Sequence, residues 1–200
     1  EYLLRSPLEP TNEPYAISKI AGIKMCESYY KQYGSDFFAL MPCNQYGPND
    51  NYHPENSHVL PALLRRFHEA VLNGKGELMV WGTGRAKREF LHVDDLASAC
   101  LFVLENIKAE NIYDLNISHL NVGSGTDISI HDLAHLLAEV TGYEGKIKFE
   151  LDKPDGTLEK LMSSKRLNLM GWKPKVSLIE GIEDTYRDFK HNYPDKIRSF

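Results

Sequence analysis

Segments of strand length alternate with segments of helical period along this sequence, and no other feature limits the fold as strongly. Residues 14–33 read as a helix that starts at Pro14, which suits a first turn, and stops at Gly34. The apolar run at 37–41 has the length of a strand buried on both faces. A helix, a short loop and a buried strand form half of a βαβ unit, so the sequence predicts an α/β fold with a largely parallel sheet.

The segments after residue 48 continue the alternation. A polar loop at 49–57 leads to a helix for which Ser57 is the expected N-cap. Asp94 or Asp95 is the expected cap of a second helix, and Ser129 and Gly142 are the expected limits of a third. The remaining expected elements are strands at 77–81, 88–93, 120–122 and 146–151, a turn at 153–156, and helices at 164–170 and 178–191.

Composition excludes several classes of protein. A net charge of -5 with both signs interspersed argues against binding to nucleic acid or to a membrane surface, so an anionic ligand would have to be held by local arginines. The three cysteines are odd in number and scattered, which argues against a disulfide framework or a zinc site and favours a reducing cytoplasm. No apolar run approaches the ~20 residues of a membrane-spanning helix.

Tyr15 and Lys19 stand four residues apart just inside the first predicted helix. That spacing places both side chains on one helix face, where the ammonium group stabilises the phenolate. Such a tyrosine can exchange a proton with a carbonyl oxygen while a nicotinamide transfers hydride, which is the chemistry of a carbonyl reductase. The spacing alone is a weak signal, because Tyr186 and Lys190 repeat it in what we interpret as an amphipathic surface helix.

The glycine fingerprint of a dinucleotide-binding turn is absent from the sequence. The nearest approach, the segment Gly123-Ser124-Gly125, lacks the third glycine, and we interpret it as an ordinary turn between a strand and a helix. The sequence also opens at Glu1 without an initiator methionine. We therefore expect it to begin in the middle of a longer protein.

Five segments, taken in order, resemble the extended short-chain dehydrogenase/reductases that act on nucleotide sugars. They are PYAISK at 14–19, PCNQYGP at 42–48, REFLHVDD at 88–95, NVGSG at 121–125 and MGW at 170–172. Within that superfamily, residues 51–70, 80–82 and 153–157 resemble the GDP-L-fucose synthase family. The resemblance covers nearly the whole sequence and fades after about residue 192.

The resemblance implies two reactions, namely 3,5-epimerisation of GDP-4-keto-6-deoxy-D-mannose and NADPH reduction of its 4-keto group. Tyr15 would protonate the C4 oxygen, Lys19 would hold the nicotinamide ribose, and His58 would act as the acid in epimerisation. A histidine suits that task, because an enolate must be reprotonated near neutral pH. The other implied residues are Pro42, Cys43, Asn44 and Gln45, with Lys19 and His58, for NADP, and Arg66, Trp81, Arg88 and Asp155 for the GDP-sugar.

The resemblance also implies an architecture, the C-terminal part of a Rossmann-type doubly wound domain interleaved with a smaller α/β substrate lobe. Residues 1–48 and 86–125 would belong to the cofactor side, and residues 49–85 and 126–200 to the substrate lobe. A cytoplasmic homodimer is expected. The dinucleotide fingerprint and the family's catalytic Ser and Cys would lie upstream of Glu1, so we expect these 200 residues alone to be inactive.

Several alternatives stay open. His58 can be a helix-start residue bonded to nearby backbone, Trp81 a core residue and Asp155 a turn residue. The whole protein can be another nucleotide-sugar enzyme, such as a 4,6-dehydratase or a 4-epimerase with tightly bound NAD. The chain can also be a truncated, non-catalytic fragment that binds only the sugar nucleotide.

Overall fold

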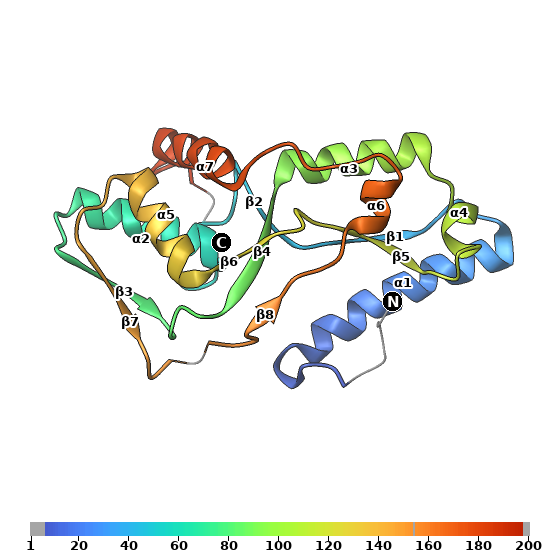
Figure 1. Ribbon diagram of the computed structural model, residues 1–200, viewed down its shortest axis with the longest axis horizontal. Helices are drawn as coiled ribbons and strands as arrows, with labels where there is room; N and C mark the ends of the chain where they lie inside the picture. The colour runs from blue at the N-terminus through green and yellow to red at the C-terminus, as the bar shows by residue number, and fades with distance from the viewer. Residues whose placement is uncertain (1–6, 154, 198–200) are drawn as a thin grey trace.

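The computed structural model describes residues 7–153 and 155–197; Glu1, and Pro154 of the predicted turn at 153–156, lie outside this range. Pairs of consecutive strands alternate with one or two helices along the chain, which agrees with the α/β class that the sequence predicts. Figure 1 shows two groups of helices with strands running between them. One group comprises α2 (Val59–Leu72), α5 (Ile130–Thr141) and α7 (Leu178–Asn192). The other comprises α1 (Glu13–Tyr33), α3 (Val93–Asn106), α4 (Ala109–Tyr113) and α6 (Lys165–Leu169).

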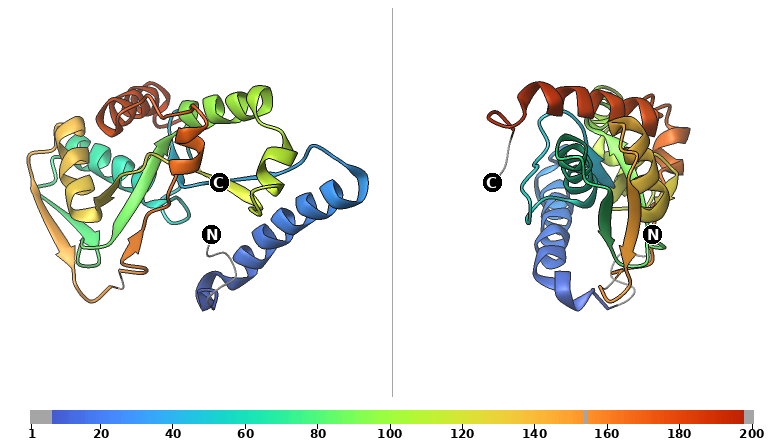
Figure 2. Two further views of the ribbon diagram at one scale, coloured as in Figure 1. Left: turned by 45° about the vertical axis from the view of Figure 1, so that its right-hand side comes forward. Right: turned by 90° about the vertical axis from the view of Figure 1, so that its left-hand side faces the viewer.

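Helix α1 begins and ends where the sequence predicts. Pro14 lies in its first turn, and Gly34 ends it in the left-handed conformation, with φ 67° and its N–H bonded to the carbonyl of Tyr30. Such a φ is strained for any residue with a Cβ, which explains the glycine. Among its residues only Ile23 is buried, and Figure 2 (left) shows the helix standing away from the body over most of its length.

One extended segment changes partner partway along. Strand β1 (Ala39–Pro42) pairs in parallel with β5 (His119–Val122), and β2 (Asn44–Tyr46) pairs in parallel with β4 (Lys87–His92). Cys43 lies between the two pairings and donates its N–H to the carbonyl of Val122 at 3.0 Å. The prediction that 37–41 is buried on both faces is wrong, because these residues are half-buried or exposed where α1 and the single paired strand cover them incompletely.

The other strands form one further small sheet and extend the sheet of β2 and β4. Strand β3 (Glu77–Trp81) pairs in parallel with β7 (Lys146–Glu150). Strand β4 also pairs antiparallel with β6 (Asp127–Ser129) and in parallel with β8 (Glu159–Lys160). A short 3-10 helix, η1 (Pro10–Asn12), precedes α1.

The predicted N-caps of two helices need correction. His58, not Ser57, is the N-cap of α2, because the Ser57 hydroxyl donates to the carbonyl of His53 instead. His92 is the N-cap of α3 and accepts the N–H of Asp94 through Nδ1. Asp95 is buried inside the first turn, where its carboxylate accepts the backbone N–H groups of residues 175 and 176. Ser129 and Gly142 bound α5 as predicted.

Two hydrophobic cores lie side by side in the described residues. The first is centred on Phe67, Leu133 and Phe189, and it joins α2, α5 and α7 to the sheet of β3 and β7. The second contains Val122, Leu167 and Trp172 and lies between α3, α6 and β5. No helix among the described residues is long and apolar enough to cross a membrane.

Candidate active site

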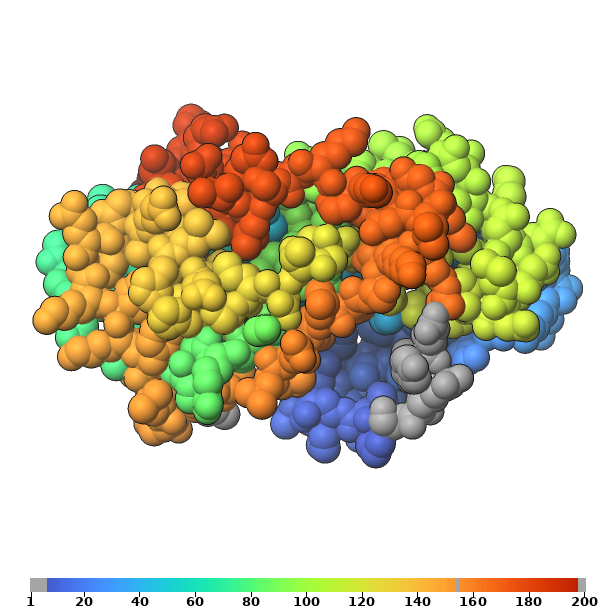
Figure 3. Space-filling model, viewed as in Figure 1, coloured from blue at the N-terminus to red at the C-terminus, as the bar shows by residue number. Residues whose placement is uncertain are grey.

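A cavity of about 180 Å³ opens where β3, β4 and the segment after β7 meet. We call it the tryptophan cavity; its lining comprises Val59, Trp81, Gly84, Ala86, Arg88, Ile130 and Asp155. Three of the predicted substrate residues, Trp81, Arg88 and Asp155, therefore lie together although they come from separate segments. Figure 3 shows the start of β4 (green) and the segment around β8 (orange) adjoining on one face.

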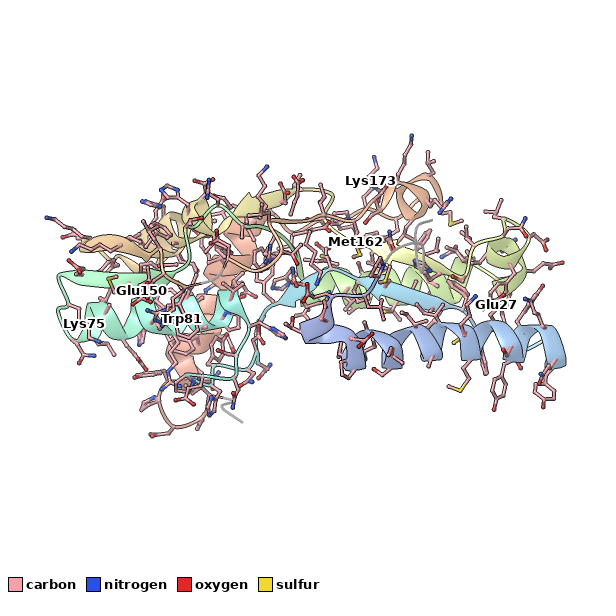
Figure 4. The ribbon with its side chains drawn as sticks, turned by 90° about the horizontal axis from the view of Figure 1, so that it is seen from below. Glu27, Lys75, Trp81, Glu150, Met162 and Lys173 are labelled. Carbon is pink, nitrogen blue, oxygen red and sulfur yellow. The ribbon has the colours of Figure 1, made fainter. Side chains whose placement is uncertain are left out.

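Trp81 ends β3 and is 69% exposed, which rules out the alternative that it is a core residue. It pairs in register with Glu150 of β7, and Figure 4 labels both residues. An exposed indole at the mouth of a cavity offers a flat apolar surface to an aromatic ring.

Asp155 is both a turn residue, bonded to Thr83, and part of the wall of the tryptophan cavity. Its two carboxylate oxygens accept the N–H and the hydroxyl of Thr83, both at 2.6 Å, and these bonds hold the pKa of Asp155 below its ordinary value. Gly82, at φ 79°, leaves room for this contact, because a Cβ there would collide with the Asp155 carboxylate. Both carboxylate oxygens are thus already engaged within the protein.

Arg88 brings a cation to the tryptophan cavity. Its Nη1 donates to the carbonyls of Lys87 at 2.7 Å and Thr157 at 2.6 Å, which fixes the guanidinium group while Nη2 faces Gly156. In the pairing of β4 with β8, Arg88 lies opposite Lys160, so two cations share one sheet face. Lys160 is not predicted from the sequence, because a two-residue strand carries no periodic signal.

Arg66 does not line either of the two cavities described here. It is half-buried on α2, and its guanidinium group donates to the carbonyl of Met79 in β3. Burial lowers the pKa of Arg66, and the nearby charge of Glu150 acts in the opposite direction. Arg66 thus stands beside the strand that ends in Trp81.

A second cavity of about 330 Å³ lies between the end of β2 and the start of α2. We call it the histidine cavity; its lining is Gln45, Tyr46, Gly47, Pro48, Asn49, Asp50, Asn51, Asn56, His58 and Val93. The His58 side chain is exposed and caps none of the N–H groups of α2. That observation removes the alternative of a histidine committed to capping its own helix.

The predicted cofactor loop lies where the extended segment 39–46 exchanges β5 for β4. In open α/β sheets, ligands bind beyond the carboxyl ends of parallel strands at such switch points, so the loop fits one half of a dinucleotide. Asn44 Nδ2 donates to the carbonyl of Glu89, and Gln45 Nε2 donates to that of Cys43. Burial, with the charge of Glu89, raises the pKa of Cys43 to about 12, so Cys43 is a neutral thiol and a poor nucleophile.

Tyr15 and Lys19 lie on α1 and line neither of these cavities. Tyr15 is 60% exposed, and Lys19 Nζ lies 5.1 Å from the centre of its ring. Tyr186 and Lys190 make the same contact at 4.6 Å, but Tyr186 is buried and its hydroxyl lies 3.0 Å from His68 Nδ1. Exposure of the phenol therefore separates the two pairs, which their spacing alone does not.

Parallel strands joined through helices, a switch point and a cavity beside it define an α/β protein of the Rossmann type, and solved structures of nucleotide-sugar enzymes share this architecture. Residues 1–123 match the family model described as "NAD dependent epimerase/dehydratase family". The chain is a member of that family.

Three proteins illustrate the similarity. GDP-L-fucose synthase 1 of Arabidopsis thaliana is 57% identical over 92% of this chain, and GDP-L-fucose synthase of Escherichia coli (strain K12) is 53% identical over 98%. The chain spans only 55% and 61% of the lengths of these two relatives. The crystal structure of a GDP-L-fucose synthetase from Naegleria fowleri bound to NADP has a TM-score of 0.87 at 26% identity, covering 98% of this chain and 61% of that one.

Proposed function

We propose that this chain is part of an NADPH-dependent enzyme that converts GDP-4-keto-6-deoxy-D-mannose to GDP-L-fucose by epimerisation at C3 and C5 and reduction at C4. The observation that carries the proposal is the tryptophan cavity, in which Trp81, Arg88 and Asp155 converge from three segments. The two curated relatives above, named GDP-L-fucose synthases, add support.

The GDP-sugar is held by complementary groups. Trp81 stacks on the guanine, and Arg88 with Lys160 faces the diphosphate, for which a planar guanidinium group and an ammonium group are suited. Arg66 assists from beside β3. Asp155 acts mainly through Thr83, because both of its oxygens are engaged there, and it shapes the cavity wall.

Epimerisation requires an acid/base group that is free of other bonds. His58 meets this requirement at the edge of the histidine cavity, where it protonates the enolate formed beside the keto group. Its catalytic partner, a cysteine by the family resemblance, is neither Cys26 nor Cys43. The raised pKa of Cys43 supports that exclusion.

Reduction requires a proton for the C4 oxygen. Tyr15 supplies it, Lys19 stabilises the phenolate and binds the nicotinamide ribose, and Pro42 to Gln45 contact the nicotinamide half of the cofactor, with His58 beside it. Bound NADPH supplies the hydride. The exposed position of α1 is compatible with this role, because the substrate and the cofactor must both reach Tyr15.

The proposal extends to organisation. Residues 1–48 and 86–125 form the cofactor side, and residues 49–85 and 126–200 form the substrate lobe. The enzyme acts as a homodimer in the cytoplasm. Several apolar side chains on α1 are exposed, among them Tyr29 and Tyr33. Their exposure supports a homodimer in which α1 packs against a second protein surface.

Product analysis with the full-length protein tests the proposal. Incubation with GDP-4-keto-6-deoxy-D-mannose and NADPH is expected to yield GDP-L-fucose and stoichiometric NADP. Turnover of a different sugar nucleotide, with this substrate untouched, would replace the proposal by a 4,6-dehydratase or 4-epimerase. Binding of GDP without binding of NADPH by the full-length protein would instead support a non-catalytic binding protein.

A further inference from the structure

The loop that leads into His58 is organised around a second histidine. His53 Nδ1 accepts the backbone N–H groups of Glu55 and Asn56, both at 3.1 Å. A ring nitrogen that accepts two N–H groups carries no proton itself, so Nδ1 of His53 acts here as a hydrogen-bond acceptor. In this arrangement His53 caps a single turn at 54–56, as Asp or Asn does at a helix start.

The backbone of His53 is also bonded on both sides. Its N–H donates to Asn51 Oδ1 at 3.1 Å, and its carbonyl accepts the Ser57 hydroxyl at 2.6 Å. Asn51 Nδ2 closes the loop by donating to the carbonyl of Asn56 at 3.4 Å. His53 therefore connects the two ends of a loop whose members Asn51 and Asn56, with His58, line the histidine cavity.

The ends of this loop are fixed by other parts of the fold. The Tyr52 side chain is buried, with its ring 4.6 Å from that of Phe189, and its carbonyl accepts a bond from Arg65 Nη1 at 2.8 Å. His58 is held as the N-cap of α2 by the bond from the N–H of Ala62 to its carbonyl at 3.0 Å. Residues 53–57, between these ends, are shaped by the hydrogen bonds within the loop, including those of Asn51.

We propose that His53 is the positioning residue for His58, and that it acts as a hydrogen-bond acceptor which shapes the loop 51–57 around the histidine cavity. This inference rests on the proposed function, since it takes His58 as the acid of epimerisation. His53 itself is not among the residues that line either cavity. Its loss therefore reduces the rate of the step that His58 performs and leaves binding in the tryptophan cavity unchanged.

The experiment compares two substitutions in the full-length enzyme. His53→Asn keeps an acceptor, because Asn Oδ1 lies as many bonds from the backbone as His Nδ1 does, whereas His53→Leu has none. The readout is deuterium incorporation from D₂O at C3 and C5 of GDP-4-keto-6-deoxy-D-mannose, with NADP⁺ present so that reduction is blocked. We expect a loss of about tenfold or more for His53→Leu and less than about threefold for His53→Asn, with GDP and NADPH dissociation constants unchanged.

A control variant and a second substitution distinguish the possible outcomes. His191→Leu, at an exposed histidine of α7, is the matched control and should exchange like the wild type. Equal rates for His53→Asn and His53→Leu, or full exchange by His53→Leu, would overturn the inference. Should His53→Leu fail to fold, His53→Gln replaces it, because the acceptor of Gln lies one bond too far from the backbone. Equal exchange rates for His53→Gln and His53→Asn would again overturn the inference. Absence of exchange in the wild type refutes the proposed function itself.

Discussion

Some residues around the tryptophan cavity are bonded to other parts of the protein, whereas others keep an exposed surface. Asp155 and Thr83 are hydrogen-bonded to each other, and Nη1 of Arg88 donates to two backbone carbonyls. Trp81 remains exposed although it is the largest apolar side chain of the lining. Exposure of so large an apolar group is costly in water, which favours a site where a ligand covers it.

Replacing Trp81 separates binding from stability. Trp81→Ala is expected to weaken GDP binding about 5- to 150-fold, since stacking of one base on an aromatic ring contributes about 1–3 kcal/mol. The melting temperature should stay nearly constant, because the indole is 69% exposed. Calorimetric titration with GDP measures the first effect, and Trp81→Phe should retain most of the affinity. Unchanged affinity in Trp81→Ala would remove this residue from the base site.

Asp155 gives the turn after β3 a dependence on pH. Its pKa is lowered in the folded protein, so its stabilising effect is present above the pKa of the unfolded chain, about 4, and is lost as pH falls through the lower folded value. Asp155→Asn should therefore melt at a lower temperature near neutral pH and show a flatter acid dependence than the wild type. Thermal melts between about pH 2.5 and 7 measure this, and parallel curves would contradict it.

At the scale of elements, periodicity and capping signals are enough to predict the long helices and the central strands. They miss β2, β6 and β8, because strands of two or three residues are defined by their partners and not by a repeat. Asn, Gly and Pro around β2 are typical of a loop, yet pairing with β4 makes residues 44–46 a strand. The cavity residues were predicted through family resemblance, whereas Lys160 and His53 required the tertiary pairing and loop bonds.

Strand β4 carries a carboxylate that binds two other segments of the chain. Glu89 is fully buried, and it accepts the N–H groups of Gly125 at 2.7 Å and Met162 at 3.2 Å, while its carbonyl accepts Asn44 Nδ2. Glu89→Ala leaves the two N–H donors unsatisfied, at a cost of about 2–4 kcal/mol in the free energy of unfolding. Chemical denaturation measures the loss, and Glu105→Ala, at an exposed site on α3, is the control.

For the whole molecule, the two cores matter more than any single site. Segment 39–46 pairs with β5 beside the second core and with β4 beside the first, and Tyr46 is itself a member of the first. Loss of packing in one core should therefore destabilise the other core as well. An arrangement of two independent lobes would behave differently.

Phe67→Ala tests this coupling. Phe67 is fully buried in the first core, and its truncation should cost about 3–5 kcal/mol. If the cores unfold as one unit, peptides from α2 and from α3 should gain amide deuterium to the same extent in hydrogen-exchange mass spectrometry. Faster exchange confined to α2 would show that the cores unfold separately.

The exchange of partners at Cys43 also limits how the molecule can move. The backbone on either side of this residue is bonded to a different neighbour, β5 before it and β4 after it. Sliding one group of helices past the other would break one of these ladders, whereas rotation about residue 43 preserves both. We therefore expect any opening or closing around a ligand to be a hinge motion near the switch point and not a shear.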